Sequence, residues 1–416
     1  MNNTGPLVSV PLSQRRSFYL ILISCLALYI TFYALLKTSP LSHDPHDSYT
    51  LQALNWWQGK ANLDHDYSYL ELAKYREKIY VSFPPVPSLI EFVLVPFFAE
   101  NTPNNLITSL YSLLSVALIV GLALQLGCTP LTAMTWANLM VLGSSLFPIS
   151  MFGGVWYTAQ ALCFLLLILC VRLLWRQTAR CYFYALICFA LAVGCRPQTI
   201  FFGPAVLGFV PTSLRFNFQK INSPEFASRR LRMSALLREY FKYFALPTLI
   251  FTLYACYNYI RFDNPFEFGH RYLPEFQMAQ FGQFSWHYIA ENLNRIFRLP
   301  TYSAAAGIGF PRFDGFAFYI ANPIFIALFF RLFKFRNKID RAATLLLLGC
   351  VLQIIFLLFH KGMGGWHFGA RYFVDMLPFI WLLILRLDPI AGFLDIALGI
   401  FGVILNCYGT YFIYRT

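Results

Sequence analysis

Long apolar runs separated by short polar segments recur along almost the whole of this 416-residue chain. A helix needs about 20 apolar residues to cross a bilayer, and about eleven segments approach that length. Charged residues make up only 12% of the chain, against about 25% in soluble domains. We therefore expect an all-α polytopic membrane protein that forms one domain over residues 1–416. The expected spans are residues 18–36, 105–126, 131–148, 155–174, 181–195, 197–211, 243–260, 316–332, 343–359, 373–386 and 390–411.

Two apolar segments need separate treatment. Residues 83–98 carry four prolines, which break helices, so we expect this segment to dip into the membrane and return. The first span follows a polar start that ends in Arg15 and Arg16, as a secretion signal would. Because the run is long enough to span and no small-residue cleavage site ends it, we expect a retained helix.

The distribution of basic residues indicates which loops face the cytoplasm. The net charge is +13, but the basic side chains lie in short loops between apolar runs, the positive-inside pattern rather than a nucleic-acid surface. Residues 212–242 alone hold seven Lys and Arg against two Glu. This pattern places the N-terminus in the cytoplasm and residues 37–104, 261–315 and 360–372 outside. The two longer outer loops are expected to contain amphipathic helices along the membrane surface.

The polar run His43–Tyr49 follows the first span directly. It places Asp44, Asp47 and two histidines beside the membrane, where ionisable groups are costly unless they are used. A carboxylate here is suited to act as a general base toward a hydroxyl group. Asp is also a favoured helix N-cap, and a surface helix is expected to begin near Ser48. We predict Asp47 as the base and Asp44 as a support or cap, with Asp44 as the competing base.

The glycine-rich run His360–Tyr372 lies between the ninth and tenth expected spans. Its four glycines let backbone N–H groups approach an anion, and Arg371 and Lys361 are suited to clamp a phosphate. A flexible hairpin is the plain alternative, but it does not explain these cations together with His367. We predict phosphate binding by Arg371, Lys361 and His367. Trp366 and Tyr372 are expected to line the same cavity.

Other cationic residues stand at the outer ends of apolar segments. Arg196 separates two apolar runs, and Arg261 ends another. The plain alternatives are that Arg196 reaches the lipid headgroups and that Arg261 pairs with Asp263; we include both arginines among the candidate phosphate ligands. The proline-dense stretch after Tyr80 predicts a rigid lip of the cavity rather than a simple helix breaker. The remaining residues expected to line the cavity are Tyr80, Lys78, His270 and Arg271.

Taken together, these stretches resemble the GT-C superfamily of glycosyltransferases, which use polyprenyl-phosphate sugars. The resemblance extends from residue 18 to about residue 381, on motifs of low individual specificity. They are Asp44 or Asp47 after the first helix, Tyr80–Pro87, Arg196–Pro197, Asn258–Phe262 and Gly369–Tyr372. The chain departs from the related protein O-mannosyltransferase and aminoarabinose transferase group. That group often has a second acid in the first loop and Lys-Pro-Pro at its end, where this chain has Asp47-Ser48 and Phe83-Pro84-Pro85.

The resemblance implies an inverting sugar transfer at the outer face of a membrane, for bacterial members the plasma membrane. The acceptor hydroxyl would belong to a cell-surface glycan, a lipid or a protein, and the leaving polyprenyl-phosphate would meet the cations named above. The sequence indicates no disulfide framework and no Cys/His metal cluster, although a divalent metal stays open. The main alternative is a transporter or flippase for a lipid-linked sugar, which would place polar residues near the bilayer midplane. Only Asp395 is an acid expected well inside a span.

Overall fold

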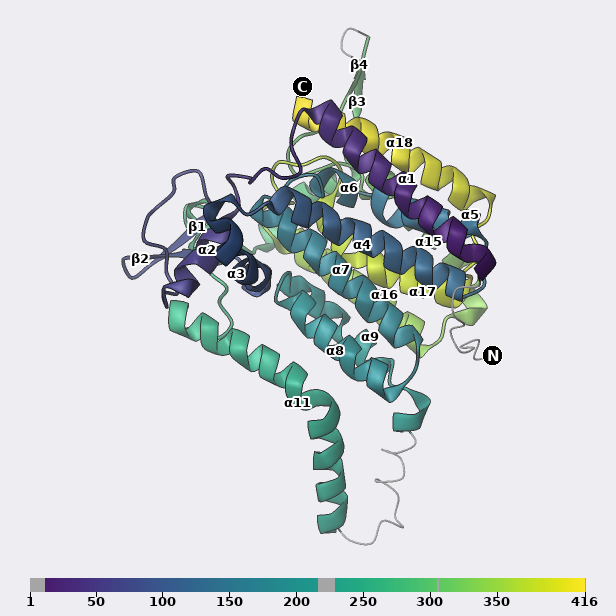
Figure 1. Ribbon diagram of the computed structural model, residues 1–416, viewed down its shortest axis with the longest axis horizontal. Helices are drawn as coiled ribbons and strands as arrows, with labels where there is room; N and C mark the ends of the chain where they lie inside the picture. Colours follow the sequence, from purple (N-terminus) through teal and green to yellow (C-terminus); the bar gives the residue numbers. More distant parts are fainter. Residues whose placement is uncertain (1–11, 216–228, 305–306, 416) are drawn as a thin grey trace.

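The computed structural model describes residues 12–215, 229–304 and 307–415, and most of these residues are helical. Within these ranges, five helices are long and apolar enough to cross a membrane. They are α1 (Leu12–Leu36), α4 (Asn104–Gln125), α7 (Val155–Trp175), α16 (Arg341–Phe359) and α18 (Phe393–Arg415). The prediction of a helical membrane protein is confirmed to this extent. A further long helix, α11 (Arg229–Phe262), contains Pro247 and is visibly bent (Figure 1).

The expected count of eleven spans is not reproduced by long helices. The segment 131–148 divides into α5 (Pro130–Ala137), the π-helical turn η2 (Asn138–Leu142) and α6 (Leu146–Ile149). Close packing accompanies this break: a Cβ added to Gly143 would lie 2.9 Å from the backbone of Gly402 in α18. The two backbones therefore meet where neither has a side chain.

Other expected spans are short helices, several of them joined to a 3-10 turn. α17 (Leu377–Leu387) is the clearest case, because its 11 residues reach only about 16 Å along the helix axis. Nearly all of them are buried, so α17 is surrounded by other helices rather than by lipid. The remaining short elements are α8 (Ala179–Val193), η3 (Pro197–Phe202), α9 (Gly203–Gly208), α14 (Phe318–Ala321), α15 (Ile324–Lys334), η6 (Arg336–Lys338), η7 (Arg371–Met376) and α17 (Leu377–Leu387).

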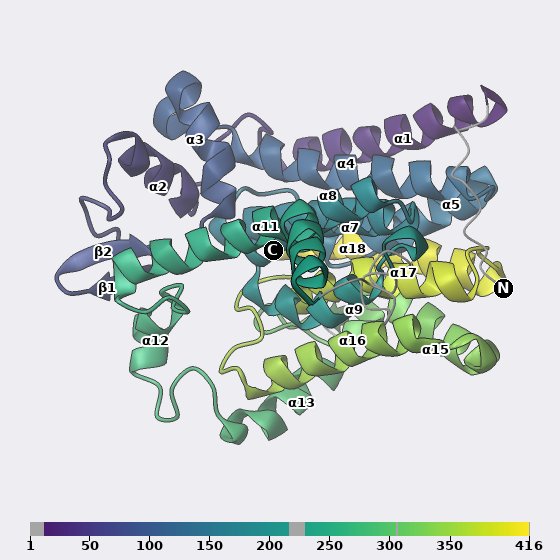
Figure 2. The same cartoon turned by 90° about the horizontal axis from the view of Figure 1, so that it is seen from below.

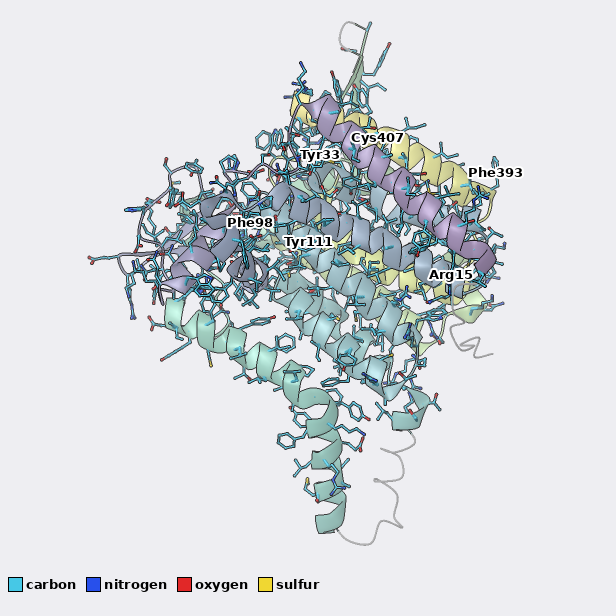
Figure 3. The ribbon with its side chains drawn as sticks, viewed as in Figure 1. Arg15, Tyr33, Phe98, Tyr111, Phe393 and Cys407 are labelled. Atoms are coloured by element: carbon cyan, nitrogen blue, oxygen red, sulfur yellow. The ribbon has the colours of Figure 1, made fainter. Side chains whose placement is uncertain are left out.

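The segments expected outside the membrane gather at one end of the helical bundle. Figures 1 and 2 show α2 (Ser48–Trp57), α3 (Val86–Phe98) and the hairpin of β1 (Leu72–Tyr75) and β2 (Lys78–Val81) at this end, whereas the start of α1 lies at the opposite end. Figure 2 also shows α12 (Pro274–Gln277) at this end. Figure 3 likewise places Arg15 and Phe393 at one end and Phe98 at the other. We call the end that carries α2 and α3 the loop end.

The first loop folds into α2 (Ser48–Trp57), an antiparallel hairpin of β1 (Leu72–Tyr75) and β2 (Lys78–Val81), and α3 (Val86–Phe98). The prediction that its prolines forbid a helix was wrong beyond residue 85. Pro87 stands in the first turn of α3, where a missing backbone donor costs no helical hydrogen bond. Pro96 lies inside the helix, and the carbonyl of Phe92, four residues before it, accepts a hydrogen bond from Trp57 Nε1 (2.8 Å) instead. The hairpin was not predicted from the sequence.

The second loop is mostly irregular, with short elements along it. They are η4 (His270–Tyr272), α12 (Pro274–Gln277), η5 (Trp286–Tyr288), α13 (Ile289–Phe297) and a second hairpin of β3 (Thr301–Ser303) and β4 (Gly307–Gly309). A short 3-10 turn, η1 (Ala99–Asn101), precedes α4.

Asp395, the acid expected inside a span, forms a buried ion pair with Arg331 of α15. Two nitrogen–oxygen contacts of 2.5 and 2.8 Å join the side chains. The guanidinium group also lies 5.0 Å from the ring centroid of Trp136 in α5. This fully paired arrangement ties α15, α18 and α5 together and explains how the acid is kept within the bundle.

Candidate active site

Asp47 is the N-cap of α2. Its Oδ1 accepts a hydrogen bond from the backbone N–H of Tyr49 (2.9 Å), and its Oδ2 accepts one from the hydroxyl of Thr50 (2.6 Å). The residue is 1% exposed. The helix-capping role that we assigned to Asp44 therefore belongs to Asp47, and that part of the prediction was wrong. Capping uses one lone pair on each carboxylate oxygen and leaves others for a proton.

Asp44 lies in the turn before α2. Its Oδ1 accepts a hydrogen bond from the backbone N–H of His46 (2.9 Å) and lies 3.2 Å from Nδ1 of the same residue. Its own backbone N–H donates to Asn104 Oδ1 (2.8 Å), which ties the turn to the start of α4. The Asp44 side chain is 13% exposed and is thus closer to solvent than that of Asp47.

A second buried carboxylate, Glu91 of α3, stands beside Asp47. The hydroxyl of Thr50 lies 2.6 Å from Asp47 Oδ2 and 3.5 Å from Glu91 Oε2, and Glu91 is fully buried. Burial, followed by the charge of Asp47, raises the pKa of Glu91, and burial also raises the pKa of Asp47. Two buried carboxyl groups this close favour holding one proton between them.

The sequence analysis missed Glu91, although a signal was present. It is the only charged residue in the apolar segment 83–98. An ionisable residue at membrane depth is a functional candidate by default. The prolines of this segment were used to predict its backbone, and its single acid was not included among the candidate site residues.

Buried polar atoms without hydrogen-bond partners surround this carboxylate pair. They include Oε1 of Glu91 and the hydroxyl groups of Ser48, Tyr49 and Tyr111. The charges of Glu91 and Asp47 both act on the Tyr111 hydroxyl. Each such atom costs about 1–3 kcal/mol, and in native proteins unpaired polar groups of this kind often mark a functional region.

Arg371 lies beneath the glycine-rich loop. Its Nε and one terminal nitrogen donate to the carbonyl of Gly364 (2.8 and 2.6 Å), while its Nη1 is buried without a partner. His367 Nε2 is also buried and unpartnered. Gly364 has φ +114°, and a Cβ there would lie 2.8 Å from Arg371 Nε, so only glycine fits. Burial, followed by the charge of Arg371, lowers the pKa of His367 to about 3.

Arg196 is near Arg371 but has an acidic partner that the sequence analysis did not assign. Its Nε lies 3.2 Å from Asp375 Oδ2, and Asp375 is 1% exposed. Gln198 donates to the same oxygen at 2.8 Å. The guanidinium groups of Arg196 and Arg371 lie 5.0 and 4.9 Å from the ring centroid of Tyr372. This site therefore holds two cations and one anion, a net positive charge.

Two histidines adjoin these arginines. The ring centroids of His270 and His360 are 6.3 Å apart. Burial, followed by the charges of His360 and Arg196, lowers the pKa of His270 to about 3. Burial also lowers the pKa of His360. Both imidazoles are therefore neutral near pH 7 and provide hydrogen bonding rather than charge.

Arg261 is occupied by structural contacts. Its terminal nitrogens donate to the carbonyl of Val81 (2.8 Å) and to Asn258 Oδ1 (3.0 Å), and the residue is 1% exposed. It fastens strand β2 to the end of α11, which leaves only its buried Nε without a partner. The alternative pairing with Asp263 was wrong, because Asp263 pairs with Arg76 at 2.7 Å.

Three other predicted cations face solvent or have other partners. Lys361 Nζ donates to the carbonyl of Glu275 (2.5 Å). Lys78 is exposed at the start of β2. The Arg271 side chain is 64% exposed and lies 3.9 Å from Glu267. The structure does not gather these three side chains with Arg371.

The two remaining aromatic candidates differ in exposure. Tyr80 is buried, with its ring centroid 5.3 Å from that of Phe262. Trp366 is 38% exposed, and its carbonyl accepts a hydrogen bond from the Tyr157 hydroxyl (3.0 Å). Tyr80 thus supports the hairpin from within, whereas Trp366 lies at the rim of the region around Arg371.

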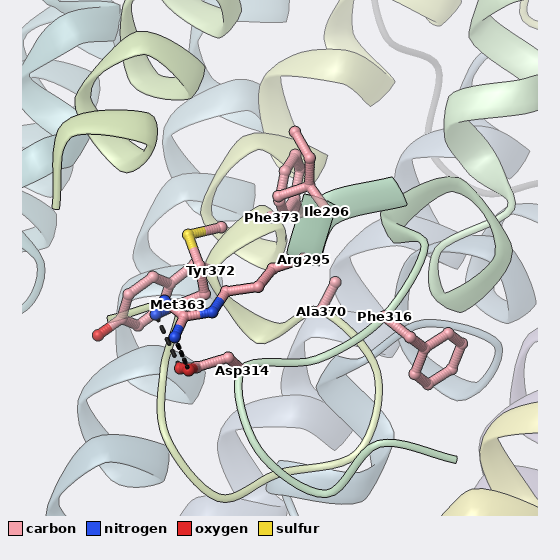
Figure 4. Close-up of a pocket in the computed structure, with 8 residues that line it drawn as sticks. All are labelled: Arg295, Ile296, Asp314, Phe316, Met363, Ala370, Tyr372 and Phe373. Atoms are coloured by element: carbon pink, nitrogen blue, oxygen red, sulfur yellow. Dashed lines mark hydrogen bonds and ion pairs between the residues drawn. The ribbon is translucent and has the colours of Figure 1, made fainter. Parts of the chain in front are cut away.

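Arg295 and Asp314, which the sequence analysis did not identify, hold the glycine-rich loop in place (Figure 4). Arg295 Nη2 lies 3.1 Å from Asp314 Oδ2. Asp314 Oδ1 accepts hydrogen bonds from the backbone N–H groups of Met363 (2.9 Å) and Gly365 (3.3 Å). Arg295 also donates to the carbonyl of Lys361 (3.1 Å). These contacts fix the loop that precedes Arg371.

The carboxylate pair and Arg196 stand on segments that contact each other. The backbone N–H of Val86, in the first turn of the helix that carries Glu91, donates to the carbonyl of Gly194, two residues before Arg196 (3.1 Å). Among the described residues, no group of three or more His, Cys, Asp or Glu side chains is placed to hold a metal ion. Asp47 and Glu91 supply only two carboxylates.

Comparisons with family models, curated proteins and solved structures give no match to this chain.

We expect Asp314→Ala to loosen the loop that carries Arg371. The change removes an ion pair and two hydrogen bonds to backbone N–H groups, which should cost about 1–3 kcal/mol of stability. Thermal unfolding and hydrogen exchange of residues 360–369 would measure it. Asp64→Ala is the matched control, because its pair with Lys60 is exposed on both sides and should contribute about 0–1 kcal/mol. Equal effects of the two changes would contradict the assigned role.

Proposed function

We propose that this protein is a membrane glycosyltransferase of the GT-C type. It transfers a sugar from a polyprenyl-phosphate donor to a hydroxyl acceptor at the outer face of the membrane. One observation carries the proposal: at the loop end of an apolar bundle, a buried carboxylate pair adjoins a cluster with net positive charge. Proton abstraction from an alcohol and departure of a phosphate need these two groups in one region.

Asp47 acts as the general base. Its carboxylate takes the proton of the acceptor hydroxyl while the hydroxyl oxygen forms a bond to the anomeric carbon. Burial raises the pKa of Asp47. Glu91 stands beside it and holds the shared proton while Asp47 is ionised, because two adjacent negative charges are unfavourable in a buried site. Thr50 and the backbone of Tyr49 hold the Asp47 carboxylate in place. Asp44, nearer to solvent, is the alternative base.

The bond from the anomeric carbon to the phosphate oxygen breaks as the new bond forms. The leaving phosphate gains negative charge, and fixed donors aimed at such charge are a large catalytic term. Arg371 Nη1 and His367 Nε2 are buried there without partners. Arg196 adds positive charge that Asp375 partly neutralises, and neutral His270 adds a hydrogen-bonding group. We no longer include Arg261 or Lys361 among the groups that contact the phosphate, or Lys78 and Arg271 among the residues that line the cavity.

An apolar cavity of about 170 Å³ lies between α8, α9 and α11. It begins near Ile200, four residues after Arg196, which corresponds to roughly 8 Å along the 3-10 turn η3. Gly203 and Val206 form one wall, and Phe244 and Phe251 of α11 form the other. Its apolar lining suits part of a prenyl chain whose phosphate lies beside Arg196 and Arg371.

A transporter or flippase is the second candidate, and the charge distribution favours it less. Transport would require polar residues free to contact a substrate within the bundle. Asp395 is the acid expected there, and both of its carboxylate oxygens are bound to Arg331. We therefore keep glycosyl transfer as the proposed function.

Replacement of Asp47 by Asn tests the base. Asn keeps the shape and is as good an N-cap as Asp, so folding and membrane insertion should be normal. Transfer should fall by about 100- to 10,000-fold, the usual contribution of a general base. Purified protein would be incubated with a panel of polyprenyl-phosphate sugars and acceptors, with products identified by mass. Full activity in Asp47→Asn together with loss in Asp44→Asn would move the base to Asp44.

Replacement of Glu91 by Gln tests the coupling between the two carboxylates. Activity requires ionised Asp47, so the rate falls as pH drops through the pKa of Asp47. Glu91, whose pKa is raised to about 9 by burial and by the charge of Asp47, holds the shared proton while Asp47 is ionised. Gln resembles this protonated form, so the acid limb should stay in place, and any change in rate as the pH rises through about 9 should disappear. Glu100→Gln, at an exposed acid of the same loop, is the control and should keep the wild-type profile. A change near pH 9 that persists in Glu91→Gln would refute the coupling.

Gly203→Phe tests the apolar cavity as the site of the prenyl chain. A Cβ at Gly203 meets only the Phe189 ring, at 3.8 and 4.0 Å, so Gly203→Ala should behave as the wild type. The larger ring fills the cavity. Loss of contact for about two CH₂ groups corresponds to roughly a tenfold higher KM for a long-chain donor. A donor with a short prenyl chain should be less affected; equal effects on both donors would contradict this assignment.

A further inference from the structure

Aromatic side chains form an exposed patch beside Asp44 at the loop end. The ring centroid of His46 lies 6.2 Å from that of Tyr69 and 6.0 Å from that of Trp156. Tyr69 is 56% exposed, and the His46 side chain is 48% exposed. Tyr67 extends the patch, with its ring 6.1 Å from that of Tyr69. We call Tyr67, Tyr69, His46 and Trp156 the aromatic patch.

Two carboxylates border the aromatic patch. Glu71 Oε2 accepts a hydrogen bond from Trp156 Nε1 (2.8 Å), and Glu71 forms no ion pair within the described part of the chain. Asp44 Oδ1 lies 3.2 Å from His46 Nδ1. Tyr67 and Tyr69 belong to the first outer loop, which was expected only to lie along the membrane surface, and the function proposed above uses neither them nor Glu71.

We propose that the aromatic patch and Glu71 bind a sugar ring of the acceptor, so that the acceptor is a glycan. A hexose presents C–H groups on one face and hydroxyl groups around its edge. Aromatic rings suit the C–H face of the sugar because they combine a broad apolar surface with polar tips. Carboxylates suit the hydroxyl groups around its edge, since an ionised carboxylate accepts strong hydrogen bonds from them.

The position of the patch fits an acceptor site. His46 immediately precedes Asp47, and its carbonyl accepts a hydrogen bond from the backbone N–H of Val155 (3.1 Å), which anchors it to the start of α7. Glu71 is also within the electrostatic influence of Arg371. A sugar on the patch would therefore lie between the base and the cationic cluster. The assignment of the bound sugar as the acceptor rests on the proposed function, whereas the binding of a sugar at the aromatic patch does not.

Other acceptors fit this surface less well. The alkyl chain of a lipid acceptor would meet Glu71, Asp44 and the polar edge of His46, which favour hydroxyl groups over hydrocarbon. A peptide in extended form relies on main-chain hydrogen bonds to a strand edge, whereas the patch presents side chains. The observations therefore favour a carbohydrate.

Saturation-transfer NMR on the protein in lipid nanodiscs would test this inference without glycoside detergents. The probes are chitotriose and maltotriose, with a Ser/Thr-rich peptide and glycerol phosphate for comparison. We expect signal transfer to the ring C–H protons of a trisaccharide. Tyr69→Ala and Glu71→Gln should each weaken that binding by roughly tenfold. Tyr302→Ala, on the separate β3–β4 hairpin and 78% exposed, is the control and should bind as the wild type.

The outcomes separate this inference from the proposed function. Absence of sugar binding, unchanged binding in Tyr69→Ala and Glu71→Gln, or binding of the peptide or glycerol phosphate instead would overturn the inference even if sugar transfer is observed. Sugar binding at the patch without any use of a polyprenyl-phosphate donor would overturn the proposed function and leave the sugar site standing. In the active enzyme, Tyr69→Ala should raise the acceptor KM and leave the donor KM unchanged; the reverse pattern would contradict an acceptor site.

Discussion

The cost of burying charge in an apolar bundle decides most of what is distinctive in this structure. A buried charge is tolerated when its partner and hydrogen bonds are complete, and Arg331 with Asp395 meets that condition. The loop end does not. There, Asp47 lies beside a second acid, Glu91, while Asp375 pairs with Arg196 and leaves Arg371 without an ion pair in the described part of the chain. The Arg331–Asp395 pair stabilises the bundle. The loop end instead keeps the Asp47–Glu91 pair separate from the arginines and leaves hydrogen-bond donors and acceptors without partners.

That separation is maintained by the structural elements around it. Asp47 caps helix α2, α3 brings Glu91 against it, and the glycine-rich loop holds Arg371 through Gly364. The neutral state of His270 and His367 follows from the same burial, since a further cation beside the arginines would be unfavourable. Substrate phosphate would supply the missing negative charge, and an acceptor hydroxyl would supply a proton donor for the carboxylates. The arginines thus lack the negative charge that the donor phosphate would provide, and the carboxylates lack the proton donor that the acceptor would provide.

Composition and apolar run length were enough to predict a helical membrane protein with its polar chemistry at one end. They were not enough to count the helices that cross. Residues 373–386 form an apolar run like a span, yet α17 is short and buried among other helices. Apolar content reports burial and does not distinguish lipid from protein as the neighbour. The split of residues 131–148 depends on Gly143 meeting Gly402, a contact between residues far apart in the sequence.

The same limit applies to the site. Local sequence was enough to select Asp47, Arg371 and His367 as candidates, because each stands in a polar run beside an apolar one. It could not show that Asp375 neutralises Arg196, that Val81 occupies Arg261, or that Asp314 fixes the glycine-rich loop, since all three depend on tertiary contacts. Glu91 was within reach of sequence reasoning as a lone acid in an apolar segment.

The dual position of Asp47 links fold and proposed chemistry. As N-cap, its carboxylate is oriented by Tyr49 and Thr50, and these hydrogen bonds favour the ionised form. Burial opposes them and favours the protonated form. A base needs both influences: orientation toward the acceptor, and a proton affinity high enough to take a proton from an alcohol. A carboxylate that only capped a surface helix would gain nothing from a second buried acid at the same hydroxyl group. The Asp47–Thr50–Glu91 contact is therefore the feature that capping alone does not explain.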